Sequence, residues 1–399
     1  MINSIKLLVL APKYKYFIKD QVEALSSYVD EIEVAIRYNP LVEVSNLFPI
    51  GDKFTHFRKY TKKSLADFDD IPKNVKISFI RTIYIVPDGS NKSVGDKIFK
   101  NICRWIEDQK IKFDLIHAHF TWPYGYVGRK LKDKYNIPLI ITAHGYDVYD
   151  LPFRDIKWNT TIRGILIASD HIITVSKNNR DKLMQLDYTT DRISIIPNGY
   201  DPSLFRQLSI ERMRKKLNLL ENKKIILSVG DLELVKGHKY LVEALNIIAR
   251  QDKNVLCIVV GSGSQEKSLK KLINNLDLGD QIKLVDSKPH AEIPFWMNAC
   301  DLFVHPSLNE GNPTVMFEAL GCGKPFVGTR VGGIPEIIIN DKLGILVEPE
   351  DPECLAKAIQ RALDTEWDEG YISEYAKQFT WDNIAKRIIE AYESVMKMK

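Results

Sequence analysis

The sequence predicts an α/β protein built from two doubly wound parallel sheets. Short β-branched runs alternate with longer stretches of helical periodicity along the whole chain, which is typical of βαβ units. At 399 residues the chain also exceeds the size of one ordinary core, so two domains are expected. The content of 45% hydrophobic and 27% charged residues is that of a globular protein.

The expected strands fall into two series. The first series comprises residues 5–11, 31–36, 75–80, 114–119, 138–144, 171–176 and 193–197. The second series comprises residues 224–230, 255–261, 282–286, 302–306, 325–329 and 344–348. The stretches between them are amphipathic; in residues 238–251, for example, Leu241, Leu245 and Ile248 share one helical face.

The boundary between the two series lies in the turn-rich segment 198–209. We therefore expect a first domain at residues 1–203 and a second at residues 204–378. Residues 379–399 are expected to hold a C-terminal helix, because their apolar positions repeat at helical spacing. That helix could pack on either domain, and we place it on the first.

Composition and cysteine spacing exclude several classes of protein. The longest apolar runs, such as residues 7–11, are far shorter than the roughly 20 residues that span a bilayer. No secretory signal is visible, so we expect a cytoplasmic protein. The five cysteines are widely spaced without a C-x-x-C pair, which favours buried, inert thiols. We expect no metal, no cofactor and no nucleic-acid partner.

The net charge of +4 is distributed unevenly. Residues 1–200 carry 30 Lys and Arg against 23 Asp and Glu, a net charge of +7, which leaves −3 for the rest. Residues 53–63 hold five basic residues and no acid, interleaved with aromatic side chains. This stretch is either a solvated face or a contact for an anionic membrane surface, which would place the protein at the inner face of the cell membrane.

The most informative stretch is "HPSLNEGNPTVMFEALGCGKP", residues 305–325. It follows a predicted parallel strand, at the edge where open α/β sheets bind ligands. Asn312 is expected to be the N-cap of a short helix with Pro313 in its first position, and Gly321 to end it. A helix start favours a phosphate, and carboxylates accept hydrogen bonds from sugar hydroxyls. Two glutamates around one helix start therefore suit a nucleotide sugar.

The same stretch resembles the E-x7-E motif of retaining nucleotide-sugar glycosyltransferases of family 4. These enzymes have the GT-B fold, in which two Rossmann-like domains face each other across a cleft. The resemblance extends over most of the chain through the motifs "DLIHAHF" (114–120), "ITAHGYDV" (141–148), "VSKNNRDKL" (175–183), "IPNGYDPSLF" (196–205), "KGHKYLVEAL" (236–245), "VVGSGSQ" (259–265) and "GTRVGGIPEII" (328–338). The order and spacing of these motifs together are specific to this family.

The resemblance implies roles for individual residues. Glu310 would bind the donor sugar and Glu318 the ribose, while Lys236 would neutralise the departing diphosphate as a point charge. His144 would face the sugar from the first domain. The loop 286–293 would contact the base. Further donor-binding residues implied at matching positions are Gly311, Asn312, Pro313, Thr314, Gly261, Gly263, Arg330, Gly332 and Gly333.

Simpler explanations exist for these residues. Glu310 and Glu318 could be a cap and a surface glutamate, and the glycines could mark strand-to-helix turns. Lone histidines, such as those at positions 117, 119 and 171, are more often core or surface residues. His144 is a stronger candidate because it ends a strand next to Gly145.

The sequence departs from the family pattern at two places. Many members have a Gly-Arg-Leu whose arginine grips the diphosphate, whereas this chain has Asp231 at that position. Either Asp231 points elsewhere or another cation, such as Arg330, replaces the missing charge. The glycine-rich loop after the first strand is also absent, and Lys13 and Lys15 occupy that region.

The resemblance implies transfer of a sugar with retention of its anomeric configuration, with the leaving phosphate as the base and without a metal. The acceptor, a glycan or a lipid-linked molecule, is expected on the first domain, in cell-surface polysaccharide or glycolipid synthesis. Two alternatives keep the fold: a sugar-nucleotide epimerase and a phosphorylase. A third is a non-catalytic protein that binds a sugar nucleotide or scaffolds a glycan-assembly complex.

Overall fold

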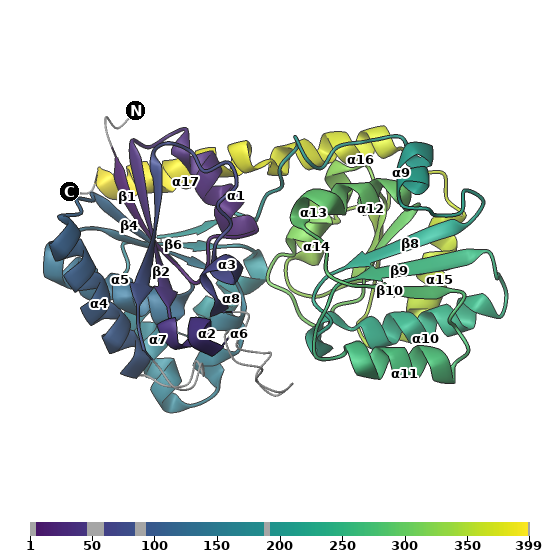
Figure 1. Ribbon diagram of the computed structural model, residues 1–399, viewed down its shortest axis with the longest axis horizontal. Coiled ribbons are helices and arrows are strands. Elements are labelled where there is room, and N and C mark those ends of the chain that lie inside the picture. Colours follow the sequence, from purple (N-terminus) through teal and green to yellow (C-terminus); the bar gives the residue numbers. More distant parts are fainter. Residues whose placement is uncertain (1–4, 46–59, 84–92, 187–191, 398–399) are drawn as a thin grey trace. The chain divides into compact units, whose positions relative to one another are not determined.

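The computed structural model describes residues 5–45, 60–83, 93–186 and 192–397, drawn in colour in Figure 1. The chain divides into two compact units, residues 1–197 with 381–399, and residues 198–380. The division falls after Pro197, whereas the sequence placed it after residue 203. Asn198 already belongs to the second unit because its backbone N–H donates to Asn312 Oδ1 at 2.8 Å.

The first unit is a parallel sheet of seven strands in the order β3-β2-β1-β4-β5-β6-β7. Its elements along the chain are β1 (Lys6–Ala11), α1 (Phe17–Ser26), β2 (Glu31–Tyr38), α2 (Pro40–Ser45), α3 (Lys62–Leu65), β3 (Val75–Arg81), α4 (Ser93–Gln109), β4 (Leu115–His119), η2 (Thr121–Gly125), α5 (Tyr126–Tyr135), β5 (Leu139–Ala143), α6 (Tyr146–Tyr149), η3 (Leu151–Phe153), α7 (Ile156–Ala168), β6 (His171–Thr174), α8 (Lys177–Met184) and β7 (Ile193–Ile195). The five inner strands are largely buried because helices cover both sheet faces, while the edge strands β3 and β7 are partly exposed.

The C-terminal helix α17 (Trp381–Met396) belongs to the first unit. It packs beside α1, as Figure 1 shows, and buries Ile384, Ile388, Tyr392 and Val395 in the core beneath them. These four residues repeat at helical spacing, so the apolar stripe predicted from the sequence is the face that packs.

The second unit is a parallel sheet of six strands in the order β10-β9-β8-β11-β12-β13. Its elements are α9 (Ile210–Lys216), β8 (Lys224–Val229), η4 (Leu234–Lys236), α10 (His238–Ala249), β9 (Val255–Val260), α11 (Glu266–Asn275), β10 (Ile282–Val285), η5 (His290–Glu292), α12 (Ile293–Ala299), β11 (Leu302–His305), α13 (Thr314–Gly321), β12 (Phe326–Thr329), α14 (Ile334–Ile337), β13 (Gly344–Val347), α15 (Pro352–Leu363), α16 (Glu369–Ala376) and η6 (Lys377–Phe379). Helices α10 and α11 lie on one face, and α12 and α13 on the other.

Each expected strand is present, with ends that differ by one or two residues, and the prediction of two doubly wound sheets is confirmed. In both sheets the strand order reverses beside the first strand, between β1 and β4 and between β8 and β11. Ligands of open α/β sheets bind at the carboxyl ends of the strands at such a point. In the second unit these strand ends lead to the segments 230–236 and 306–310.

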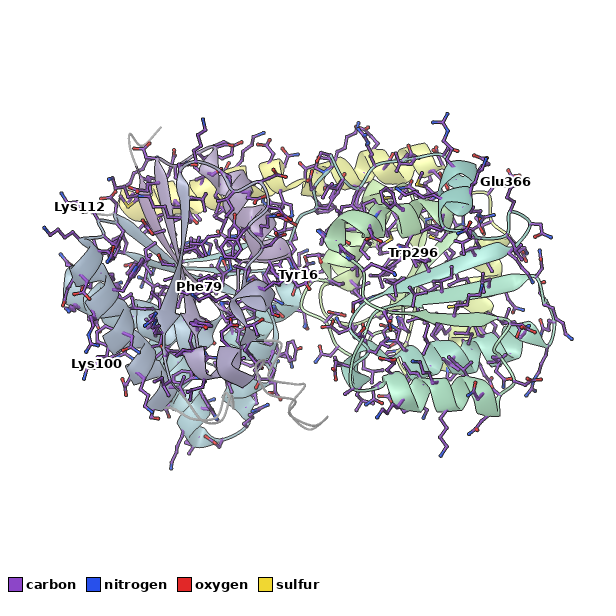
Figure 2. All side chains as sticks on the ribbon, in the orientation of Figure 1. Tyr16, Phe79, Lys100, Lys112, Trp296 and Glu366 are labelled. Atoms are coloured by element: carbon purple, nitrogen blue, oxygen red, sulfur yellow. The ribbon has the colours of Figure 1, made fainter. Side chains whose placement is uncertain are left out.

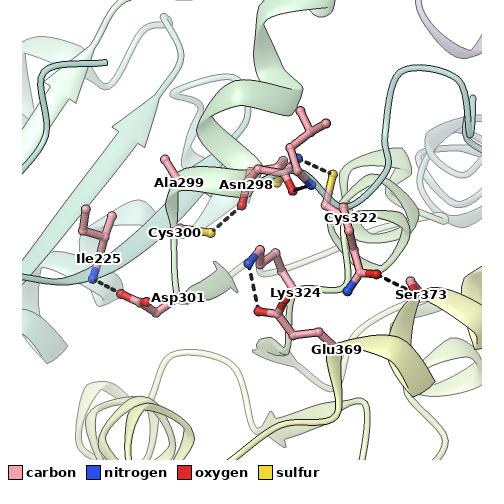
Figure 3. A network of polar contacts seen from close by, with 12 residues as sticks. Ile225, Asn298, Ala299, Cys300, Asp301, Cys322, Lys324, Glu369 and Ser373 are labelled. Carbon is pink, nitrogen blue, oxygen red and sulfur yellow. Dashed lines mark hydrogen bonds and ion pairs between the residues drawn. The ribbon is translucent and has the colours of Figure 1, made fainter. Parts of the chain in front are cut away.

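The opposite edge of the second sheet is held by partly buried polar contacts. Figure 3 shows Asp301 accepting the backbone N–H of Ile225, at 2.7 Å, and Lys324 reaching Glu369, at 2.9 Å. The Asp301 contact ties the start of β11 to that of its neighbour β8, and the Lys324 contact ties the start of β12 to the first residue of α16. The edge that carries the candidate site is therefore built on a fixed sheet.

Surface and thiol predictions have mixed outcomes. Figure 2 shows Lys100, Lys112 and Glu366 on the outside of their units, where charged side chains are solvated.

Four cysteines are buried as expected, but Cys354 is exposed. Cys354 lies in the first turn of α15, and its backbone N–H donates to the capping Asp351. Within the described ranges, no helix is both long and apolar enough to cross a membrane.

Most of the basic stretch 53–63 lies outside the described residues. In its described part, Thr61 caps α3 and the backbone N–H of Lys62 donates to Glu43 at 2.8 Å. The Lys62 ammonium lies 5.1 Å from the ring centroid of Tyr38. This lysine therefore packs on its own unit.

Candidate active site

Glu310 lies in the loop between β11 and α13 and is only 7% exposed. A second loop, which contains Gly332 and Gly333, packs against the backbone of this loop. Gly332 has a φ of 54°, and a Cβ there would lie 1.8 Å from the carbonyl oxygen of Glu310. The N–H of Gly333 donates to the carbonyl of Gly311 at 2.9 Å. Glycine is required at position 332 both for the backbone angle and for this close packing.

Three side chains converge on the Oε1 atom of Glu310. They are Lys236 through Nζ at 2.6 Å, His305 through Nε2 at 2.8 Å and Ser307 through Oγ at 2.7 Å. Burial opposes ionisation, but the charges and hydrogen bonds of Lys236 and His305 outweigh it and lower the pKa of Glu310 to about 2. Glu310 is therefore a carboxylate at neutral pH.

Lys236 reaches Glu310 because the chain turns sharply after it. Gly237 adopts a φ of 65°, and a Cβ at this position would lie 2.0 Å from the carbonyl oxygen of Pro306. The loop after β8 is thus pressed against the end of β11, the two strands at which the sheet order reverses. This close approach forms the ion pair, and only glycine allows it.

The start of α13 differs from the prediction by one residue. The helix begins at Thr314 with Pro313 as its N-cap, and no side chain caps it. Asn312 is not the N-cap; its Oδ1 and carbonyl oxygens instead accept hydrogen bonds from Asn198, at 2.8 and 2.7 Å. The first amides of α13 are therefore left without a side-chain acceptor, which suits an anionic ligand.

Glu318 lies on α13 and is 5% exposed. His290 approaches its Oε1 with Nε2 at 2.9 Å, and the His290 ring packs on Phe205 with centroids 5.1 Å apart. His290 begins η5, in the loop 286–293 predicted to contact a base. The sequence did not indicate this pair, because the two residues are far apart in the chain.

His144 directly follows β5 in the first unit and contacts a second histidine. Its Nε2 lies 3.0 Å from His119 Nδ1, and their rings stack with centroids 5.2 Å apart. Burial lowers the pKa of His144 well below its usual range and that of His119 to about 3, so both are neutral. Within the described residues, His144 Nδ1 and His119 Nε2 have no hydrogen-bond partner.

The loop that carries His144 is fixed by Asp147. One carboxylate oxygen of Asp147 accepts the N–H groups of His144 and Gly145, at 3.1 and 3.0 Å. The other accepts the N–H of Thr121 at 2.7 Å. Burial raises the pKa of Asp147 above its usual range, against the effect of these backbone donors. Asp147 thus ties the ends of β4 and β5 together.

Two family models match the chain one after the other. Residues 69–204 match Glycosyltransferase Family 4, and residues 209–379 match Glycosyl transferases group 1. An uncharacterised glycosyltransferase of Methanocaldococcus jannaschii is 31% identical over 314 residues, which cover 75% of this chain and 79% of that protein. The chain belongs to glycosyltransferase family 4. This membership favours an enzyme over the non-catalytic alternative.

Other comparisons agree with this family. The D-inositol 3-phosphate glycosyltransferase of Corynebacterium glutamicum (strain R) is 28% identical over 72% of this glycosyltransferase and 74% of its own length. Sucrose-phosphate synthase of Thermosynechococcus elongatus superposes with a TM-score of 0.78 at 22% identity, over 99% and 100% of the two chains. Anabaena HepE in complex with UDP-glucose gives 0.73 at 21%, over 98% and 100%. At such identities the likeness shows the fold, which confirms the predicted GT-B class.

In this glycosyltransferase the predicted glycines of the GSG motif have packing roles. A Cβ at Gly261 would lie 1.9 Å from the carbonyl oxygen of Gly230, and one at Gly263 would lie 2.4 Å from that of Leu232. The loop after β9 thus packs directly on the loop after β8. Close approach to another backbone explains both glycines, and their approach to a donor stays a prediction.

The structure also shows where Asp231, which stands at the family's arginine position, and Arg330, the suggested substitute, lie. Asp231 is exposed, while its neighbour Leu232 is buried. Arg330 lies 3.7 Å from Glu348 in a solvent-exposed ion pair. Such pairs hold a side chain weakly, so Arg330 is able to exchange Glu348 for another anion. The substitution of its charge for the missing arginine stays a prediction.

The loop after β1 is closed by a buried aromatic residue instead of glycines. Tyr14 is fully buried, and its N–H donates to the carbonyl of Leu65 at 2.8 Å. Lys13 lies 4.6 Å from the ring centroid of Tyr16, which has a φ of 52°. This loop is shaped by packing against residues 65–67.

The sequence missed the histidines that support the predicted residues. His305 and His290 bind the two glutamates, and His119 contacts His144. His117 and His171 are structural, as expected: His117 bonds to Tyr392 and Thr142, and His171 bonds to Ser194. The position of His305 two residues before Ser307 at a strand end was the available signal.

Proposed function

We propose that this glycosyltransferase moves a sugar from a nucleotide diphospho-sugar to a glycan or lipid-linked acceptor with retention of configuration. The observation that carries the proposal is the buried, ionised Glu310 paired with Lys236 beside the uncapped start of α13. This arrangement combines an acceptor for sugar hydroxyls, a cation and free amides for phosphate. Pro313 and Thr314 at that start, with Gly311 and Asn312 before it, line the proposed donor site.

In the proposed reaction the bond between the anomeric carbon and the diphosphate breaks, and a bond to the acceptor oxygen forms on the same face. The acceptor's proton passes to the departing phosphate oxygen, so no further base is needed. Lys236 stabilises the charge that develops on the diphosphate. Glu310 binds the sugar, and Glu318 binds the ribose next to His290. The role of His144 stays a prediction from the family resemblance.

The comparisons suggest the first substrates to test. HepE was crystallised with UDP and with UDP-glucose, which makes UDP-sugars the first donor candidates. Relatives named D-inositol 3-phosphate glycosyltransferase make that compound a first acceptor candidate, since an anionic acceptor also suits the +7 charge of residues 1–200. Transfer to inositol phosphate would identify a phosphorylated polyol as the acceptor. Transfer only to lipid-linked glycans would exclude inositol phosphate as the acceptor.

The proposal includes a cytoplasmic site of action with peripheral binding to anionic membrane through residues 53–63. Its support is the concentration of five basic residues without an acid in that stretch. Flotation with vesicles that contain phosphatidylserine tests this point at low salt. The full protein is expected to float with them, and replacement of the five basic residues by Gln should abolish this; unbound protein would contradict membrane binding.

Metal-independent transfer is also part of the proposal, because Lys236 and the α13 amides supply the positive charge that a metal would otherwise provide. The initial rate is expected to be unchanged in EDTA. Loss of activity in EDTA with recovery on addition of Mg²⁺ or Mn²⁺ would overturn metal independence, while leaving the donor site in place.

A thermal-shift screen with UDP, GDP, ADP and their sugar conjugates tests the donor site. A ligand that binds only the native state raises the melting temperature. One nucleotide class should stabilise the wild type and stabilise Glu318→Ala less, with Glu366→Ala, a change at an exposed glutamate outside the proposed site, as the control. No stabilisation by any of them would contradict the proposed site. If a donor does stabilise the wild type, its turnover would exclude the scaffold alternative.

A further inference from the structure

His305 is the last residue of β11 and is 3% exposed. Its ring packs against Phe303 and Phe326, with centroids 6.3 and 6.4 Å away. From this position Nε2 points to Glu310 Oε1 at 2.8 Å and also lies 3.0 Å from Ser307 Oγ. The ring is thus held by the core of the second unit while its edge contacts the donor-site carboxylate.

The chemistry of the cluster determines where the proton of His305 lies. An ionised carboxylate has no proton to donate, so a side chain that hydrogen-bonds to it must be the donor. His305 therefore carries hydrogen on Nε2, and Ser307 donates its hydroxyl proton to the same oxygen. Within the described residues, no hydrogen bond reaches Glu310 Oε2. One carboxylate oxygen is anchored and the other is left for a ligand.

We propose that His305 is a positioning residue of the transfer reaction, which anchors Glu310 through Oε1 and thereby presents Oε2 to the donor sugar. This inference rests on the proposed function. It goes beyond it by assigning opposite roles to the two oxygens of Glu310, and by giving a role to a residue outside the E-x7-E pair.

The anchor matters most when the donor is bound. Lys236 also bonds to Oε1 in the free protein, yet the proposed reaction requires it at the diphosphate. When Lys236 turns to the diphosphate, Glu310 loses its nearest cation while it stays buried. His305 and Ser307 are then the donors that keep the carboxylate ionised and in place, since hydrogen bonds to the charged form favour it.

The titratable groups that face this cluster come from three elements. They are Lys236 at the end of η4, His238 at the start of α10 and His305 itself on β11. Burial, with the charges of His305 and Lys236, lowers the pKa of His238 to about 3, so His238 stays neutral. Loss of the His305 hydrogen bond therefore acts on Glu310, whose ionisation should then require a higher pH.

The test compares His305→Phe, which keeps the aromatic packing and removes the donor, with His305→Gln, whose amide can replace the Nε2–H. With UDP-glucose, or the donor found in the thermal screen, the Phe variant should lose about 10- to 100-fold in kcat/KM, the range expected for a hydrogen bond to a charged group. The acid limb of its pH profile should move to higher pH. The Gln variant should recover most of both, and UDP affinity should change by less than about threefold in either variant.

The matched control is His171, which is also buried and bonds to a serine hydroxyl, Ser194, at 2.9 Å. His171→Phe is expected to leave kcat/KM unchanged. A second readout is the ring ¹⁵N spectrum of the ligand-free wild type, in which His305 should show the Nε2-protonated form.

Four outcomes would overturn the inference. They are an unprotonated Nε2, an unchanged kcat/KM in His305→Phe, an equal loss in His305→Gln, and a loss in His171→Phe as large as that in His305→Phe. The first is independent of turnover. A wild type that turns over no nucleotide sugar would instead refute the proposed function, and this inference with it.

Discussion

Glu310 combines two properties that normally exclude each other, burial and charge. A buried carboxylate keeps its charge only when neighbouring donors and cations compensate for lost solvation. Here Lys236, His305 and Ser307 provide this compensation, all at one oxygen. The site therefore holds a carboxylate in the free protein with its second oxygen available, which is the state that binding of sugar hydroxyls requires.

At this scale the clearest prediction concerns Lys236. Replacing it by Met removes the cation at Glu310 and at the proposed diphosphate position, so kcat should fall by about 100-fold or more. Lys236→Arg keeps the charge without the same geometry and should retain more activity. Steady-state kinetics with a saturating donor distinguish the two. Equal activity of the Met variant and the wild type would show that Lys236 does not stabilise the leaving group.

At the scale of elements, glycines bring the site's loops together. The turn at Gly237 presses the loop after β8 against β11, and Gly332 lets a second loop support Glu310. At each position the glycine has a positive φ, and an added Cβ would overlap with a carbonyl oxygen of the neighbouring loop. The geometry of the site thus depends on close approach between loops as much as on its charged residues.

Gly237→Ala tests this dependence. The methyl group would lie 2.0 Å from the Pro306 carbonyl, and the left-handed backbone disfavours alanine, which together should cost about 1–3 kcal/mol. The variant should therefore have a lower melting temperature and bind the nucleotide more weakly. The control is Gly279→Ala, where a Cβ meets nothing within 4 Å. Similar melting temperatures for the two variants would contradict the packing role.

Some of these elements could be predicted from the sequence, and others could not. The strands were predictable because apolar β-branched runs report local burial, and Glu310, Glu318 and Lys236 were indicated by a motif with fixed spacing. Asn312 was expected to cap α13, yet it bonds to Asn198. That contact joins residues more than a hundred positions apart, and capping preferences describe only local competition. The same reason hid the pair His290–Glu318.

At the scale of the whole molecule, several buried histidines are held neutral. Burial lowers the pKa of His119 and His238 to about 3 and those of His117 and His144 well below 6.5. Between pH 6.5 and 3 the unfolded chain therefore binds protons at these positions that the folded protein does not. Their contribution to stability is intact above pH 6.5 and is lost as the pH falls.

We expect the free energy of unfolding to decrease from pH 7.5 to pH 5, by up to about 1 kcal/mol per pH unit for each such histidine. Glu310 adds a loss at lower pH, since its folded pKa of about 2 lies below the ordinary value of 4.5. Urea unfolding at a series of pH values measures this, and His238→Phe should show a shallower dependence. A stability that is flat between pH 7.5 and pH 5 would contradict neutral burial.

The central claim is that Glu310 binds the sugar of a nucleotide diphospho-sugar in the second unit. Calorimetric titration of UDP and UDP-glucose into the wild type and Glu310→Gln tests it most directly, with GDP or ADP pairs substituted if the thermal screen selects them. We predict that Glu310→Gln binds the sugar nucleotide about tenfold or more weakly, as the loss of a charged hydrogen bond implies, and binds the free nucleotide as the wild type does. Equal affinities of the wild type and the variant for the sugar nucleotide would contradict the account.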